Sequence, residues 1–407
     1  MNDLLVDPHY WLNHLRTPEW TAEECSHTIR EHNNTVVDLL ELVSFQYPIT
    51  IRDNRVLFDS GGLKLDDSFW ETTSNNVQSS ELFSVPMYGF STRLTNVRKY
   101  PTETMAFRTS EDREFDQFQD TTLHTFEPVV VTAKSHDELW YYIQSTTYTG
   151  WVKQSDIALC SREEFHTIYK TKDICIVANS SVATQAQPYD SQISCIPVEF
   201  GAVLPLSKRA DESIGNQSHH GNLRVLLPLS DANGKFYTKE AFIRKSSGVH
   251  TGYLPFTRKT IVQMAFSLLG ERYGWGGRFG HHDCSSFVMD IYRTAGVQLP
   301  RDAGDQEHAL PNHIKISDHA TREQRHELLC QLSAGDLLFM PGHVMMYLGL
   351  LNGEHYMIHD FSGHYENGNR IPINQIMVTP VTIYAGEAKT YLESLTGVLN
   401  LFVRCDK

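Results

Sequence analysis

The chain has 407 residues, which is enough for two to four domains at roughly 150 residues each, and its 41% hydrophobic and 21% charged residues are ordinary for a globular protein. Thirty-five Lys and Arg against 49 Asp and Glu give a formal charge of −14. This balance argues against nucleic acid and anionic membranes as partners, because both need a concentrated positive face. The start of the chain lacks the basic and apolar regions of a secretion signal, so we expect a cytoplasmic protein, or an exported one if the chain is processed.

The cysteines are few for this length and odd in number, and they lack the paired close spacing of a disulfide or zinc framework. We therefore expect a reducing compartment and at least one free thiol. The seven are Cys25, Cys160, Cys175, Cys195, Cys284, Cys330 and Cys405.

The first part of the chain, to about residue 82, has helical signals. Thr21 and Glu24 form a capping box ahead of a predicted helix. A second apolar face is indicated by Val36, Val37, Leu39, Leu40 and Val43. We predict a small helical segment followed by an extended arm.

The middle of the chain has the pattern of short strands separated by turn residues. Strands are predicted at 129–132, 140–143, 150–152, 175–177 and 203–206. A faint repeat relates Phe126-Glu-Pro-Val129 and Gly150-Trp-Val152 to Phe200-Gly-Ala-Val203 and Gly252-Tyr-Leu254. The repeat predicts two copies of one small β-barrel module.

After Pro255 the periodicity becomes helical. One predicted helix carries Ile261, Met264, Ala265 and Leu268 on one face and ends before Gly270; a second begins at about Cys284 and ends before Gly296. Strands are predicted at 337–340, 344–351 and 355–361. We therefore divide the chain into a helical segment at 1–82, β-modules at 83–161 and 162–252, and an α+β domain at 253–407.

Cys284 lies where a glycine-rich loop meets the start of a predicted helix. Unpaired N–H groups and the positive end of the helix dipole stabilise a thiolate there, so we expect a thiol pKa below about 8.5. The loop glycines would let the backbone approach a substrate closely. The alternative is that Cys284 is a small buried apolar residue.

Two histidines on or beside predicted strands, His343 and His359, complete the thiol, base and orienting group that a nucleophilic cysteine needs. A two-residue Asn352-Gly353 hairpin would place His359 opposite Met346, on the other face from His343. A catalytic pair therefore needs a register irregularity, and we predict a bulge at this turn.

A metal site is the competing interpretation. Potential ligands stand together at His281, His282, Asp283 and Cys284, with further histidines at 308, 313, 319 and 326. Adjacent residues rarely converge on one tetrahedral ion, and the metal motifs C-x-x-C and H-E-x-x-H are absent from the sequence. We expect neither a metal nor another cofactor.

The order of these motifs resembles that of the NlpC/P60 cysteine peptidases, which cleave bacterial cell-wall peptides. The matching residues are Tyr273-Gly-Trp-Gly-Gly277, Asp283-Cys-Ser-Ser-Phe287, Leu299-Pro-Arg301 with Gln306, Gly335-Asp-Leu-Leu-Phe339, His343-Val-Met-Met-Tyr-Leu-Gly349 and His359. Two departures are Ser286, where the family more often has glycine, and the long interval between His343 and His359. The resemblance implies a papain-like α+β catalytic domain.

Carried over by position, Cys284 resembles the nucleophile of that family, His343 the base that forms an ion pair with it, and His359 the residue that orients the base. Tyr273 resembles the tyrosine that assists at the oxyanion, beside the backbone N–H of Cys284. The order Cys, His, His argues against circularly permuted relatives.

The β-modules resemble bacterial SH3 domains, and the whole arrangement resembles YkfC-like γ-D-glutamyl-L-diamino-acid endopeptidases. In that subgroup the first SH3 module restricts the cleft to peptides with a free N-terminal L-alanine. The resemblance assigns Glu127, Tyr148, Asp283 and Ser285 to the amine site. For Glu127 the alternative is a solvated strand end.

The resemblance implies hydrolysis of the γ-D-glutamyl to diamino acid bond, with diaminopimelate or lysine in third position, in peptidoglycan-derived peptides. A free-amine requirement favours released muropeptides over intact wall. Two alternatives stay open. One is a Cys-His-His amidase or acyltransferase, and the other is an inert protein that binds peptidoglycan peptides or a partner.

Overall fold

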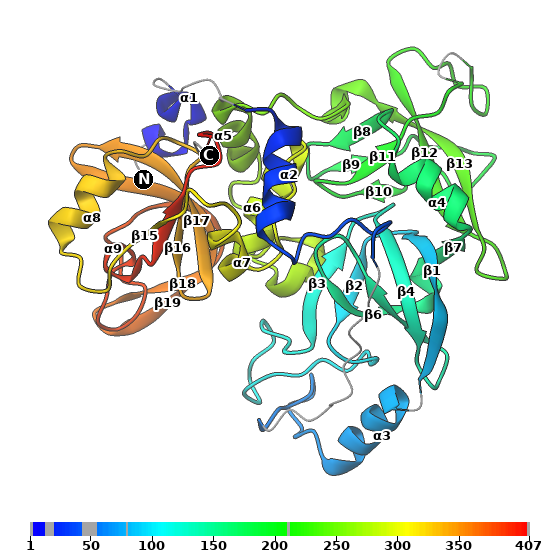
Figure 1. Ribbon diagram of the computed structural model, residues 1–407, viewed down its shortest axis with the longest axis horizontal. Coiled ribbons are helices and arrows are strands. Elements are labelled where there is room, and N and C mark those ends of the chain that lie inside the picture. The colour runs from blue at the N-terminus through cyan, green and yellow to red at the C-terminus, as the bar shows by residue number, and fades with distance from the viewer. Residues whose placement is uncertain (1–2, 13–19, 43–54, 79, 210–211, 405–407) are drawn as a thin grey trace. The chain divides into compact units, whose positions relative to one another are not determined.

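The computed structural model describes residues 3–12, 20–42, 55–78, 80–209 and 212–404 (Figure 1). Helices and sheets are both present, so the α+β fold class is confirmed. The chain forms two compact units. Unit 1 comprises 1–36, 253–274 and 281–407, and unit 2 comprises 37–252 and 275–280. In the described part of the chain, none of the helices has the length and apolar character needed to cross a bilayer.

The N-terminal part contains short helices. They are η1 (Asp3–Val6), α1 (Pro8–Trp11) and α2 (Ala22–His32). The capping box before α2 is confirmed, because Thr21 accepts the Glu24 N–H through its hydroxyl and donates its own backbone N–H to the Glu24 carboxylate. Residues 33–42 form turns and irregular backbone. Val43 lies outside the described residues.

A seven-stranded antiparallel sheet forms the first half of unit 2, in the order β3-β2-β6-β5-β4-β1-β7. Its strands are β1 (Glu81–Ser91), β2 (Thr95–Arg98), β3 (Gln119–Leu123), β4 (Pro128–Lys134), β5 (Trp140–Gln144), β6 (Thr149–Lys153) and β7 (Ile157–Cys160). The strands predicted at 129–132, 140–143 and 150–152 are confirmed. A helix that the sequence pattern did not predict, α3 (Asp67–Gln78), and the short η2 (Gln154–Asp156) accompany the sheet. Among the described residues the pairing runs from β3 to β7 as an open sheet rather than the expected closed barrel.

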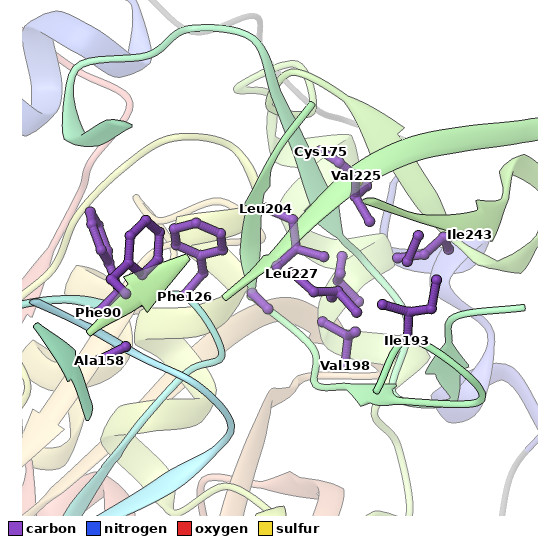
Figure 2. Close-up of a cluster of buried hydrophobic side chains, with 14 of the residues drawn as sticks. Phe90, Phe126, Ala158, Cys175, Ile193, Val198, Leu204, Val225, Leu227 and Ile243 are labelled. Carbon is purple, nitrogen blue, oxygen red and sulfur yellow. The ribbon is translucent and has the colours of Figure 1, made fainter. Parts of the chain in front are cut away.

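Smaller sheets form the second half of unit 2. The elements are α4 (Arg162–Tyr169), β8 (Ile174–Val177), β9 (Val182–Ala183), β10 (Pro197–Val198), β11 (Val203–Pro205), β12 (Asn222–Ser230), β13 (Phe236–Arg244), η3 (Lys245–Ser247) and β14 (Val249–Thr251). One apolar core joins the two halves, from Phe90 and Phe126 to Leu204 and Leu227 (Figure 2). The strands predicted at 175–177 and 203–206 are confirmed, whereas the repeat of one module stays a prediction.

The glycine-rich segment η4 (Trp275–Gly280) belongs to unit 2 and packs on β3. Gln119 donates its side-chain amide to the Gly276 carbonyl at 2.8 Å. A Cβ on Gly277, whose φ is +82°, would lie 2.5 Å from the Thr122 hydroxyl. These two glycines therefore permit close packing on a strand of the same unit, which corrects the expectation that they make room for a substrate.

Unit 1 contains a six-stranded antiparallel sheet in the order β15-β20-β16-β17-β18-β19. Its strands are β15 (Ile314–Lys315), β16 (Leu337–Met340), β17 (His343–Leu351), β18 (Glu354–Glu366), β19 (Asn369–Pro380) and β20 (Gly397–Leu399). The helices are α5 (Arg258–Ser267), α6 (Cys284–Thr294), α7 (Ala303–Glu307), α8 (Arg322–Leu329) and α9 (Tyr391–Ser394). The two predicted helices and three predicted strands are confirmed, and β18 continues beyond its predicted end. Helix α6 packs against β17 and β18, which brings its first residue towards the strands that carry the two histidines (Figure 1).

Candidate active site

Cys284 is the first residue of α6, as predicted. The residue before it, Asp283, has extended backbone and accepts the Ser286 N–H at 3.0 Å. Ser286 in turn accepts the Asp283 N–H through its hydroxyl at 2.8 Å. This reciprocal capping box defines where the helix begins. A glycine in place of Ser286 would have no hydroxyl to accept the Asp283 N–H.

Cys284 is 8% exposed, and its thiol faces the backbone N–H of Val344. Its pKa is raised to about 12, chiefly by burial and secondarily by the Asp283 carboxylate, while the Val344 N–H opposes the rise. The expected lowering of the pKa by the helix N-terminus is therefore wrong for the resting protein. Removal of the thiol from water outweighs the favourable helix field.

The side chains of His343 and His359 meet across β17 and β18. His343 Nε2 and His359 Nδ1 lie 2.9 Å apart. Asn352 and Gly353 both have positive φ, 53° and 79°, and Leu351 pairs directly with Glu354, so the turn is a regular two-residue hairpin.

The irregularity that allows this contact lies inside β17. Gly349 pairs with Tyr356 but Tyr347 pairs with Met357, so Leu348 is the extra residue. Beyond it the alternation of faces is shifted by one residue, and the two histidines share a face. The need for a bulge is confirmed, whereas its predicted place at the turn is wrong.

His359 continues the contact into the interior. Its Nε2 lies 2.9 Å from the hydroxyl of Thr379 in β19, and its ring stacks on Phe361 at 4.0 Å between centroids. Burial holds the pKa of His359 well below its usual range, and the neighbouring His343 lowers it further. Thr379 was not found in the sequence analysis, because no motif marks a residue on the next strand.

One protonation pattern consistent with these contacts leaves His343 able to act as a base. If His359 donates Nε2–H to Thr379, its Nδ1 accepts from Nε2–H of His343, and Nδ1 of His343 carries the lone pair. Burial lowers the pKa of His343 to about 4. Burial thus raises the pKa of the Cys284 thiol and lowers the pKa of His343, and both shifts favour the uncharged pair over the expected resting ion pair.

Asp283 and Ser285 are both held by Arg301. The guanidinium donates to Asp283 Oδ2 at 2.6 Å and to the Ser285 hydroxyl at 2.7 Å. Burial opposes ionisation of Asp283, but Arg301 holds its pKa below the usual range. Tyr273 is buried in the same electrostatic environment, where burial and then the Cys284 thiol raise its pKa. Arg301 belongs to the Leu-Pro-Arg motif, and the motif alone does not indicate its contacts with Asp283 and Ser285.

A buried carboxylate and histidine network adjoins the N-terminus of α6. His282 Nδ1 lies 2.6 Å from Glu271, and its Nε2 lies 3.3 Å from Asp290. Burial alone would lower the pKa of His282, but hydrogen bonds to Asp290 and Glu271 raise it to about 10. The two carboxylates therefore favour the protonated form of the buried His282 ring.

Asp360, directly after His359, is buried, and its carboxyl oxygens have no hydrogen-bond partner among the described residues. Burial raises its pKa to about 9, His282 lowers it, and Asp283 and Glu271 raise it. At neutral pH Asp360 is an uncharged carboxylic acid.

Glu127 and Tyr148 belong to unit 2. Glu127 is 5% exposed, its N–H donates to the Ser91 hydroxyl, and its carboxylate lies 3.6 Å from His124 Nδ1. It is therefore not a solvated strand end. Tyr148 lies before β6 and packs at the margin of a core cluster of unit 2. Their assignment to an amine site stays a prediction.

Two family models match the chain. The NlpC/P60 family matches residues 270–390, which contain Cys284, His343 and His359. The SH3 domain of the SH3b1 type matches residues 105–153, which contain Glu127 and Tyr148.

Curated relatives match part of the chain. A γ-D-glutamyl-L-lysine dipeptidyl-peptidase of Bacillus subtilis is 33% identical over 140 residues, which are 31% of this chain and 43% of that protein. A protein of the same description from Bacillus cereus is 27% identical over 215 residues, which are 50% of this chain and 54% of that one. The chain thus spans about half the length of the curated relatives that it matches.

Solved structures share the fold over more of the chain. An NlpC/P60 endopeptidase of Photobacterium damselae subsp. piscicida aligns over 97% of both chains with a TM-score of 0.77 and 18% identity. An NlpC/P60 family protein of Bacillus cereus aligns over 78% of this chain and all of the other, with a TM-score of 0.53 and 19% identity. The family models identify an NlpC/P60 family domain at residues 270–390 and an SH3 domain at residues 105–153, and the solved structures show that the fold is shared.

Proposed function

We propose that this protein is a cysteine peptidase in which Cys284 is the nucleophile, His343 the general base and His359 the residue that orients the base. The observation that carries the proposal is the hydrogen-bonded chain from Thr379 through His359 to His343, formed on the strands against which the first turn of α6 packs. The Val344 N–H at the thiol joins Cys284 to the strand that bears the base.

The resting charges define how attack begins. Because Cys284 and His343 are both uncharged, the thiol proton passes to Nδ1 of His343 as the sulfur attacks the carbonyl carbon. His343 becomes an imidazolium whose Nε2–H donates to His359. The C–N bond then breaks, His343 gives its proton to the leaving amine, and a thioester on Cys284 remains.

Hydrolysis of the thioester reverses these roles. Water gives a proton to His343 and attacks the thioester carbonyl, and the C–S bond breaks with return of the proton to the thiol. The Cys284 N–H at the start of α6 and the Tyr273 hydroxyl are the proposed donors to the oxyanion of each tetrahedral intermediate. Burial keeps Tyr273 protonated, as a donor must be.

The proposed substrate is a peptidoglycan peptide, L-Ala-γ-D-Glu followed by diaminopimelate or lysine, cut after the γ-D-glutamyl residue. The names of the curated relatives support this bond type. A free L-alanine amine would be held by Glu127 and Tyr148 together with Asp283 and Ser285. In this proposal Glu127 is the carboxylate that receives the ammonium, because Arg301 already neutralises Asp283.

Mass spectrometry tests the proposal with L-Ala-γ-D-Glu-diaminopimelate beside its N-acetylated form. We expect release of L-Ala-γ-D-Glu from the free-amine peptide only, no release by Cys284→Ala, and normal release by the matched control Cys195→Ser. Glu127→Gln is expected to lose the preference for the free amine. Equal cleavage of both peptides would discard the amine site, and cleavage of neither would replace the peptidase with a binding protein.

A further inference from the structure

A second group of reactive side chains lies in unit 1, outside the candidate active site. His326 is in α8, Cys330 caps the end of that helix, and His355 is near the start of β18. One ligand atom from each lies within 4.8 Å of the others. His355 and His359 are four residues apart on β18, so the group is separated from the candidate triad by about 13 Å of strand.

The distances are close to those of a tetrahedral zinc site. Cys330 Sγ lies 4.0 Å from His355 Nε2. His326 presents Nδ1 to His355 Nε2 at 2.9 Å and Nε2 to Cys330 Sγ at 3.7 Å, and only one of these two nitrogens would bind the ion. With Zn–N of about 2.0 Å and Zn–S of about 2.3 Å, ligand atoms of one tetrahedral ion are about 3.3–3.6 Å apart. One ligand atom from each residue lies within 4.8 Å of the others, so modest side-chain rotations would bring the three to these distances.

Local structure brings the three together. His326 and Cys330 are four residues apart along one helical face, and the Cys330 N–H donates to the His326 carbonyl at 3.0 Å. The side of the β17 and β18 hairpin that meets α8 supplies the third group. Leu329 lies between the two helical ligands in sequence and is packed in the same core cluster as Tyr347 and Met357 of that hairpin, which anchors the helix.

The proposed third ligand, His355, is held in place by a hydrogen bond to Tyr347. The hydroxyl of Tyr347 in β17 lies 2.7 Å from His355 Nδ1, and His355 is buried. A histidine that binds a metal through one nitrogen usually donates its other N–H to an oxygen, which fixes both tautomer and ring orientation. Tyr347 would have this role, because it leaves Nε2 of His355 facing His326 and Cys330.

We propose that His326, Cys330 and His355 form a zinc site with Tyr347 as its supporting residue. One thiolate and two imidazoles suit Zn²⁺, whereas Mg²⁺ and Ca²⁺ prefer oxygen ligands. Cys330 is exposed, so water from solvent has access to the fourth position. The ion would tie α8 to the same two strands that carry His343 and His359.

The test uses the full chain with Cys284→Ala, which removes the candidate nucleophile as a competing zinc ligand. After dialysis against a chelator, calorimetric titration with Zn²⁺ is expected to show one equivalent bound, and titration with Mg²⁺ none. Adding Cys330→Ser or His326→Ala should weaken Zn²⁺ binding at least about 100-fold, and adding Tyr347→Phe about 10- to 100-fold. Adding Cys195→Ser or His319→Ala, which alter side chains outside the site, should change nothing.

Co²⁺ gives a second readout that is independent of catalytic activity. Thiolate ligation should produce a charge-transfer absorption in the Cys284→Ala protein that is absent when Cys330→Ser is added, while circular dichroism verifies that both are folded. Lack of stoichiometric Zn²⁺ binding, or equal binding with and without Cys330, would overturn the proposal and leave a hydrogen-bonded histidine pair only.

Discussion

His343 and His359 contact each other because one residue, Leu348, is inserted into β17 between them and the hairpin turn. Their ring nitrogens lie 2.9 Å apart, whereas the regular register of the Asn352-Gly353 turn would place the rings on opposite faces. The bulge is thus the feature of the fold that brings the proposed base and its orienting residue together from adjacent strands.

Thr379 is predicted to position His359 through the hydrogen bond to Nε2. Thr379→Val keeps the shape but leaves a buried N–H without its partner, so we expect kcat to fall about 10-fold, equivalent to about 1.4 kcal/mol, with KM nearly unchanged. Steady-state kinetics on the free-amine peptide measures the effects on kcat and KM separately. Thr379→Ser should restore kcat, and a rise in KM with normal kcat would argue against a positioning role.

The raised pKa of the Cys284 thiol predicts its reactivity towards alkylating agents. Below a pKa of about 12 the thiolate fraction rises tenfold for each pH unit, so the rate of iodoacetamide labelling should climb continuously from pH 6 to 10. Peptide mapping measures it, with exposed Cys195 in the same digest as a reference for the reagent. A rate that is constant between about pH 5 and 8 would instead show a resting ion pair with His343.

Ser286 is predicted to stabilise the protein through the capping box with Asp283. Ser286→Gly removes the hydroxyl that accepts the Asp283 N–H and adds backbone freedom to the first turn of α6, so unfolding should become easier by about 1–2 kcal/mol. Chemical denaturation measures the change, and Ser286→Thr is the control that keeps the hydroxyl. An unchanged denaturation midpoint for glycine would show that Asp283 alone caps the helix.

Asp360 is predicted to make the stability of the protein fall as pH rises. Burial raises its folded-state pKa to about 9 from an unfolded value near 3.9, so between these pH values the folded state retains a proton that the unfolded state has lost. The free energy of unfolding therefore decreases by up to about 1.4 kcal/mol per pH unit over this range.

Asp360→Asn removes this ionisation. Compared with the unsubstituted protein, the variant should have a flatter dependence of Tm on pH between 5 and 9 and a higher Tm at pH 8. Parallel Tm–pH profiles of the two proteins would contradict a buried neutral carboxyl at this position.

Patterns local in sequence predicted the elements that carry the site. The helix that begins at Cys284 follows from the apolar spacing of the residues after it, and the strands of His343 and His359 follow from their apolar runs. The position of the bulge could not be predicted, because Leu348 is one apolar residue in an apolar run. The register of β17 depends on its pairing with both β16 and β18.

Features that depend on tertiary packing were missed or misjudged. Thr379 and Arg301 reach the site from a different strand and loop, and no short motif links them to their partners. The thiol pKa was expected to fall because sequence places Cys284 at a helix N-terminus, but the extent of its burial emerges only when α6 packs on the sheet. The glycines at 276 and 277 were misread for the same reason.

Acid quenching of the enzyme during turnover of L-Ala-γ-D-Glu-diaminopimelate, followed by intact-mass and peptide analysis, tests the central role of Cys284 most directly. The account predicts an acyl adduct with the mass of the dipeptide minus water, confined to the peptide that contains Cys284 and absent from Cys284→Ala. An adduct on another residue, or turnover that survives in Cys284→Ala, would contradict it.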